Sequence, residues 1–159
     1  MDKITLERIE LMHPDYRKEL RDQYLAINAK LPRGVRLRLS HTLRTIDEQN
    51  TLFAMGRTAP GSIVTNSKGG QSIHNFGLAF DIVILLDTDN NNTFETALYS
   101  GKHFIKVVNY FKAQGWEWGG DWKNFKDMPH FQAKKSDGTS YKWRELSVLP
   151  KDKNNYPIL

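Results

Sequence analysis

The chain lacks cysteine entirely among its 159 residues. This absence excludes a disulfide framework, an iron–sulfur cluster, a cysteine-ligated zinc site and a cysteine nucleophile. Any metal must therefore be held by histidine, aspartate or glutamate. The sequence also lacks an apolar run near the roughly 18 residues that a membrane span requires, so no membrane insertion is expected. Residues Met1 to Glu10 are charged and amphipathic, without the apolar core of a secretory signal.

The composition is that of an ordinary globular protein, with 39% hydrophobic and 26% charged residues. At this length we expect a single domain over residues 1–159, with a core of about 11–132 and a C-terminal extension, 133–159, of unassigned role. The net charge of +5 favours polyanionic partners. The basic residues are scattered and no nucleic-acid docking motif is present, so no nucleic-acid partner is expected.

Hydrophobic periodicity and punctuation by glycine and proline predict an α+β fold with a small, mostly antiparallel sheet and flanking helices. A capping box of Thr45 and Glu48 marks the start of the second predicted helix. Residues 57–72 are expected to form a long loop, and loops of this length are usually functional or mobile. Helices are expected at Pro14–Leu31, Thr45–Met55 and Lys102–Gln114, and strands at Val35–Ser40, Phe76–Leu86, Trp116–Trp118 and His130–Gln132.

One carboxylate stands out because it interrupts the most apolar segment of the chain, Leu78 to Ile84. A charge at Asp81 is unfavourable there unless it is paired or bound to a metal. His74 and His130 could complete a three-ligand zinc site that leaves one position open for water. The odd spacing between His74 and Asp81 places them on opposite faces of a regular strand, so the chain must turn between them, and Gly77 permits such a turn.

A second carboxylate, Asp127, lies three residues before His130. Pro129 favours an extended conformation at Met128, which can bring Asp127 beside the water of a zinc site. A carboxylate in that place can act as general base and then as general acid. His41 is a further candidate beside the site, whereas His13 and His103 are interpreted as structural residues.

Three segments together resemble a known family: Ser-x-His-x-x-Gly-x-Ala-x-Asp from residue 72, Gly-Gly-Asp-Trp from 119 and Asp-Met-Pro-His-Phe from 127. They are similar to the zinc peptidases that cut peptidoglycan stem peptides. This group includes D-alanyl-D-alanine carboxypeptidases and L-alanyl-D-glutamate endopeptidases, some of them phage endolysins. The resemblance covers about residues 11–132 and is nearest to the L-alanyl-D-glutamate group.

The resemblance implies a hedgehog/DD-peptidase-like fold and Zn²⁺ held by His74, Asp81 and His130. It makes Asp127 the catalytic base. It also implies that Arg44 faces the zinc, binds substrate and polarises the scissile carbonyl, and that Ser72 lines the substrate cleft.

The expected function is zinc-dependent hydrolysis of peptidoglycan stem peptides by a monomer acting on the cell wall. Because no secretory signal is visible, we expect accumulation in the cytoplasm and release of the phage type. Two alternatives stay open: a D-alanyl-D-alanine carboxypeptidase, and a catalytically inactive, zinc-stabilised wall-binding domain. Trp116, Trp118 and Trp122 are expected in the core or the cleft wall, and Asp121 in a turn.

Overall fold

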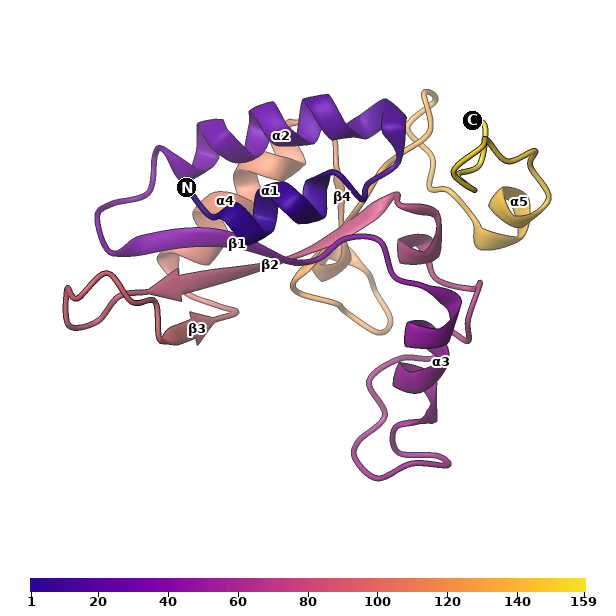
Figure 1. Ribbon diagram of the computed structural model, residues 1–159, viewed down its shortest axis with the longest axis horizontal. Coiled ribbons are helices and arrows are strands. Elements are labelled where there is room, and N and C mark those ends of the chain that lie inside the picture. The colour runs from indigo at the N-terminus through magenta and orange to yellow at the C-terminus, as the bar shows by residue number, and fades with distance from the viewer.

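The computed structural model describes all residues, 1–159, as helices packed on an antiparallel sheet (Figure 1). The helices are α1 (Lys3–Ile9), α2 (Pro14–Asn28), α3 (Ile46–Ala54), α4 (Lys102–Ala113) and α5 (Trp143–Ser147), with 3₁₀ turns η1 (Ile73–Phe76) and η2 (Gly119–Asp121). The strands are β1 (Val35–His41), β2 (Ala79–Leu86), β3 (Thr96–Leu98), β4 (Glu117–Trp118) and β5 (His130–Gln132). None of the helices has the length and apolarity needed to cross a bilayer.

The sheet is built around β2, the longest and most apolar strand. Its order is β1-β2-β5-β4, with β3 paired to the remaining length of β2, and every pair is antiparallel. Side chains alternate between the two faces of a strand. Phe80, Ile82 and Ile84 therefore share the face that joins the core cluster, and Asp81 lies on the opposite face.

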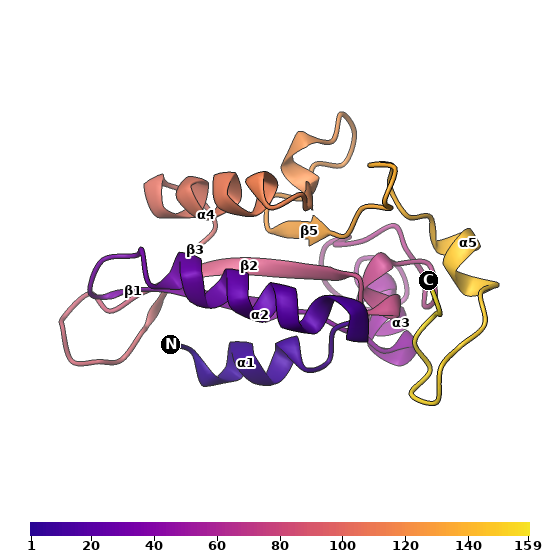
Figure 2. The ribbon, with the colours of Figure 1, turned by 90° about the horizontal axis from the view of Figure 1, so that it is seen from above.

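The core lies between that apolar face and a layer of helices. Figure 2 shows α1, α2 and α4 running alongside one another over the sheet. Phe80 stacks on Phe131 of the neighbouring strand, with ring centroids 5.3 Å apart, and both side chains are fully buried. Because neighbouring strands present paired residues to the same face, this aromatic pair fixes the register that sets Asp81 opposite His130.

The structure confirms the predicted elements with shifted ends and adds three that the sequence reading did not include: α1, β3 and α5. The Thr45–Glu48 capping box is present at the start of α3. The strand predicted from Phe76 begins only at Ala79, because Ser72 caps the turn η1 and Gly77 ends it in a left-handed conformation with φ of 71°. The loop 57–72 follows α3, which projects from the body of the molecule (Figure 1).

Candidate metal centre

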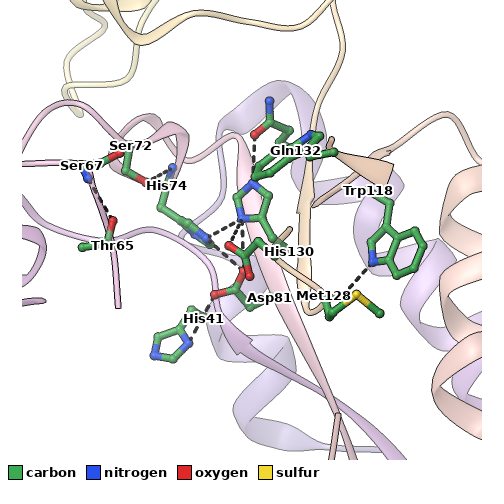
Figure 3. Close-up of polar contacts among 12 residues, drawn as sticks. His41, Thr65, Ser67, Ser72, His74, Asp81, Trp118, Met128, His130 and Gln132 are labelled. Carbon is green, nitrogen blue, oxygen red and sulfur yellow. Dashed lines mark hydrogen bonds and ion pairs between the residues drawn. The ribbon is translucent and has the colours of Figure 1, made fainter. Parts of the chain in front are cut away.

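Three side chains from separate parts of the fold meet at the sheet face that the helices leave uncovered (Figure 3). His74 comes from the turn η1, Asp81 from β2 and His130 from β5. Asp81 and His130 are partners in the β2–β5 ladder, so strand pairing alone places them side by side. The left-handed turn at Gly77 brings His74 back over the start of β2, as the odd spacing required.

The three candidate ligand atoms form a nearly equilateral triangle. His74 Nε2 lies 3.2 Å from Asp81 Oδ1 and 3.2 Å from His130 Nδ1, and His130 Nδ1 lies 3.3 Å from Asp81 Oδ1. Ligands at about 2.0–2.1 Å from a tetrahedral zinc lie about 3.3 Å apart. The triangle therefore has the size of one face of a zinc coordination tetrahedron, and all three residues line the cleft.

The chemistry of the donor set also suits a bound cation. His74 Nδ1 donates to the carbonyl oxygen of Thr42 at 2.7 Å, and His130 Nε2 donates to Gln132 Oε1 at 2.9 Å. Each neutral imidazole carries one N–H, so the inward nitrogens present lone pairs to each other and to the carboxylate of Asp81. Three electron-pair donors at this distance repel unless a metal ion or a proton lies between them, so the residues fit a divalent metal.

Charge perturbations follow from the same arrangement. Burial would raise the pKa of Asp81, but the imidazoles of His74 and His130 outweigh it and hold that pKa well below its ordinary value. Burial would lower the pKa of His130, yet hydrogen bonding to Asp81 and the charge of that carboxylate raise it. The carboxylate of Asp81 and the imidazole of His130 thus each favour the ionised form of the other.

Asp127 and Arg44 flank the triangle from two sides. Asp127 Oδ2 lies 3.9 Å from His130 Nδ1, and Arg44 Nη2 lies 3.7 Å from Asp81 Oδ2. Burial raises the pKa of Asp127, and the charge of Asp81 raises it further against the opposing effect of His130. His41 Nδ1 lies 3.7 Å from Asp81 Oδ2, and burial lowers the pKa of its imidazole. The three sequence candidates nearest the triangle are thus held together.

The triangle lies in a cleft of about 660 Å³. The loop 57–72 forms one rim and the segment 122–128 forms the other. Ser72 lines the cleft, and its hydroxyl also accepts from the backbone N–H of His74 at 3.3 Å. Trp122 lines the cleft beside the ring of His130, and Trp116 is buried in the core.

Sequence reasoning missed two polar residues that hold the site in place. Gln132 orients His130, as described above. Gln49, which is fully buried, accepts from Arg44 Nη1 at 3.0 Å and donates to the carbonyl oxygen of Ser67 at 2.7 Å. A glutamine two residues after a ligand on the same strand was the available signal for Gln132, since alternation returns it to the same face. Gln49 had no comparable signal.

The remaining candidates lie away from the triangle. His13 is buried and donates from Nε2 to the carbonyl oxygen of Pro157 at 2.6 Å, in the structural role expected of it. Asp121 ends the turn η2 and pairs with Lys112 at 2.6 Å. A second acidic group, Asp87, Asp89 and Glu95, forms part of the polar connection between β2 and β3.

The chain is similar in sequence to known proteins. Residues 65–133 match a protein family described as D-alanyl-D-alanine carboxypeptidase. Over 105 residues the chain is 38% identical to the peptidoglycan L-alanyl-D-glutamate endopeptidase CwlK of Bacillus subtilis (strain 168), covering 63% of this chain and 62% of that protein. Over 99 residues it is 30% identical to the L-alanyl-D-glutamate peptidase of Listeria phage A118, covering 62% of this chain and 31% of that protein.

A solved structure shares the fold. The crystal structure of the L-Ala D-Glu endopeptidase ChiX of Serratia marcescens matches with a TM-score of 0.59 and 21% sequence identity, over 88% of this chain and 93% of that one. The chain thus spans somewhat less than two thirds of the length of the Bacillus relative and about a third of the phage relative. These matches confirm the resemblance drawn from the three sequence segments.

Proposed function

Since the chain is a relative of the peptidoglycan L-alanyl-D-glutamate peptidases, we propose that it is a zinc-dependent hydrolase that cuts stem peptides at the L-alanyl-D-glutamate bond. The observation that carries the proposal is the triangle of His74, Asp81 and His130, in which three electron-pair donors converge on one point beside a cleft. The substrate is the peptidoglycan stem peptide, and the place of action is the cell wall.

The metal would be held by His74 Nε2, Asp81 Oδ1 and His130 Nδ1. A bound Zn²⁺ in such a site polarises the scissile carbonyl and lowers the pKa of a water molecule toward neutrality. Thr42 and Gln132 keep the imidazoles in the tautomers that direct lone pairs inward. A carboxylate as the third ligand would lower the positive charge of the site.

Asp127 is proposed as the general base and acid. Its carboxylate lies at the cleft side of His130, where it can accept a proton from the attacking water and deliver it to the leaving amine of the D-glutamyl residue. A raised pKa makes the carboxylate a stronger base than an ordinary aspartate. Arg44, held by Gln49, supplies a fixed positive charge for the developing oxyanion or for a substrate carboxylate. Ser72 is proposed as a cleft residue that contacts the substrate.

Metal analysis of the purified protein and mass spectrometry of digested muropeptides test this proposal together. We expect about one zinc per chain and new fragments that begin at D-glutamate. An Asp127→Ala variant should keep its zinc and lose about 10²–10⁴-fold in turnover, the usual contribution of a general base. Unchanged turnover in this variant would overturn the role of Asp127, and a protein without zinc affinity would overturn the function.

A second candidate is favoured by the family match itself, which is described as D-alanyl-D-alanine carboxypeptidase. Both reactions can use the same metal triangle and differ only in the part of the stem peptide that the cleft accepts. Release of D-alanine from synthetic D-Ala-D-Ala peptides, without cleavage after L-alanine, would assign the carboxypeptidase activity. Retention of Asp127 beside the triangle argues against an inactive wall-binding domain.

The proposal also includes the fold group, the domain organisation, the oligomeric state and the route to the wall. We assign the fold to the hedgehog/DD-peptidase-like group and treat residues 1–159 as one domain, since Leu146 of the C-terminal extension joins the same core cluster as β2. The proposed protein is a monomer with no nucleic-acid partner. Release to the wall by a phage-type route remains the proposed path.

A further inference from the structure

A second cavity, of about 340 Å³, adjoins the cleft on the side of the C-terminal extension. Half of its wall is shared with the cleft itself, namely Gln71, Ile73, Trp122 and Gln132. Ile73 directly precedes the ligand His74, and Gln132 orients the ligand His130. A ligand that lies across the metal triangle can therefore continue into this cavity without leaving the protein surface.

The other half of the wall comes from one short segment of the extension, Tyr141 to Arg144. The segment is anchored, because Tyr141 and Trp143 pack against the core cluster and Leu146, one turn further on, is only 1% exposed. Figure 2 shows α5 at the edge of the molecule, at the end where α3 also lies. The extension thus presents a preformed wall, and this wall lies outside the residues that the family match covers.

The charges of this wall have one sign. Lys142 and Arg144 line the cavity, and its other lining residues are aromatic, aliphatic or amide-bearing, with no carboxylate among them. The guanidinium of Arg144 lies over the ring of Trp143, with its carbon 4.7 Å from the ring centroid. The neighbouring acid of α5, Glu145, is paired with Lys135 at 2.6 Å. The two cations are left for an anionic ligand, in contrast with the cleft, which contains Asp81 and Asp127.

We propose that this cavity is a subsite for the carboxylate-bearing residues of the stem peptide beyond the D-glutamyl residue. The inference rests on the proposed function, which places the scissile bond at the metal triangle. Beyond that bond a stem peptide carries free carboxylates, including a side-chain carboxylate where the third residue is diaminopimelate. Lys142 and Arg144 pair with these carboxylates, and the Trp122 and Trp143 rings pack on the aliphatic parts of the chain.

Two synthetic peptides test the subsite: N-acetyl-L-alanyl-D-glutamyl-γ-X-D-alanine with diaminopimelate or with lysine at X. The wild-type protein should bind and cleave the diaminopimelate peptide with the lower KM. A Lys142→Ala/Arg144→Ala variant should raise KM for that peptide about tenfold, leave kcat nearly unchanged and abolish the preference, since two charge-assisted contacts are lost. A Lys134→Ala/Lys153→Ala variant removes two exposed cations of the extension that line neither cavity, and it should keep the preference.

Calorimetry can measure the binding of both peptides to the zinc-loaded Asp127→Ala variant, alone or combined with either of the two double substitutions. These measurements separate failure of the subsite from failure of the proposed function. If neither peptide is cleaved by the wild type but the binding preference follows Lys142 and Arg144, the hydrolase proposal fails and the subsite stands. Equal affinity for both peptides, or equal effects of the two double substitutions, overturns the subsite. Preferential binding of a muramyl disaccharide that is insensitive to the Lys142→Ala/Arg144→Ala change would assign the cavity to glycan and overturn it as well.

Discussion

The floor and the rims of the cleft are built in different ways. On the floor, Asp81 and His130 are fixed by a strand ladder, and each imidazole is locked by a hydrogen bond on its outer nitrogen. On the rims, Ile63 and Val64 are 58% and 56% exposed and Phe125 is 81% exposed. Phe125 also has a positive φ of 50°, which non-glycine residues seldom adopt.

The difference indicates that the floor and the rims of the cleft have separate functions. Regular structure holds the groups that need accuracy of about half an ångström, and loops hold the groups that meet a long, variable substrate. Substitutions on the floor should therefore change metal affinity and turnover, whereas substitutions on the rims should change KM and leave the metal in place.

The largest effect is expected from Asp81→Asn, which keeps the shape of the side chain and removes its charge. We expect loss of zinc on dialysis and a fall in turnover of at least about a thousandfold, because the site loses its one anionic ligand. Metal content and muropeptide hydrolysis measure the two effects. Asp121→Asn is the control, since Asp121 is an exposed carboxylate paired with Lys112. Retention of zinc by Asp81→Asn would contradict the ligand set.

Gln132→Leu should act through His130 without touching the metal. The outer N–H of the imidazole loses its acceptor, and we expect zinc affinity to fall about 10–100-fold, the usual effect of removing a group that orients a ligand. Gln132→Glu retains an acceptor oxygen and should restore most of the affinity. Competition with a chelator measures the affinities, and ¹⁵N NMR of the histidines reports the tautomer. An unchanged tautomer in Gln132→Leu would show that the strand alone orients His130.

Protons should compete with zinc for the floor. Asp81 raises the pKa of His130, so zinc affinity should fall about tenfold per pH unit below that pKa. In the metal-free protein the stabilisation from His130 is complete below its ordinary pKa of 6.5 and is lost as pH rises through the raised value. The lowered pKa of Asp81 contributes stability above its ordinary value of 3.8 and loses it in acid.

Asp81 and His130 should therefore stabilise the metal-free protein most between pH 3.8 and 6.5, their ordinary pKa values. Above pH 6.5 this stabilisation declines, and bound zinc should raise the melting temperature by a larger amount. Thermal unfolding with and without zinc across pH 5–8 (a range of about three pH units in which histidine titrates) measures this effect. A zinc contribution to the melting temperature that does not change with pH would contradict the proposed competition.

Gln49→Leu should affect the connection between floor and rim. The substitution removes the acceptor of Arg44 and the donor to Ser67, and it leaves two polar groups without a partner. We expect kcat/KM to fall about five- to tenfold, with unchanged zinc affinity and a loss of stability of about 1–3 kcal/mol. Gln49→Glu keeps the acceptor and loses only the donor, so it separates positioning of Arg44 from anchoring of the loop. Weakened zinc binding in either variant would break the division between the two regions.

The sequence predicted those parts of the protein that depend on local pattern. The apolar run around Asp81 indicated both the central strand and a stranded charge, and Thr45 with Glu48 indicated the start of α3. It did not predict α1, in which three of the seven residues are charged and which is anchored by Asp2, whose carboxylate accepts from Arg38 at 2.9 Å. That contact joins residues far apart in the chain, and no local periodicity reports it.

The site residues also fall into two groups, those that local sequence pattern predicts and those that depend on distant contacts. The proposed ligands could be chosen from residue type and spacing, because a buried carboxylate and two histidines have few other uses. Two of the groups that hold the site in place could not, since Thr42 acts through its backbone carbonyl and Gln49, which holds Arg44, through a contact with a distant loop. The short helix α5 was missed because it has only five residues, too few to show a helical periodicity, and Leu146 is the one fully buried residue among them.

The smallest effect is expected from Phe125→Ala on the rim. Its ring is largely exposed and lines the cleft, so its removal should raise KM about two- to threefold through lost apolar contact with substrate. Turnover and zinc content should not change, because the ring of Phe125 contributes no polar atom to the metal triangle. Val148→Ala, an 82% exposed apolar residue outside the cleft, controls for surface apolarity. Because Phe125 has a positive φ, Phe125→Gly should also relieve backbone strain and raise stability slightly. A fall in kcat equal to that of a floor substitution would show that the rim closes over the metal triangle during turnover, and the two regions would then act as one.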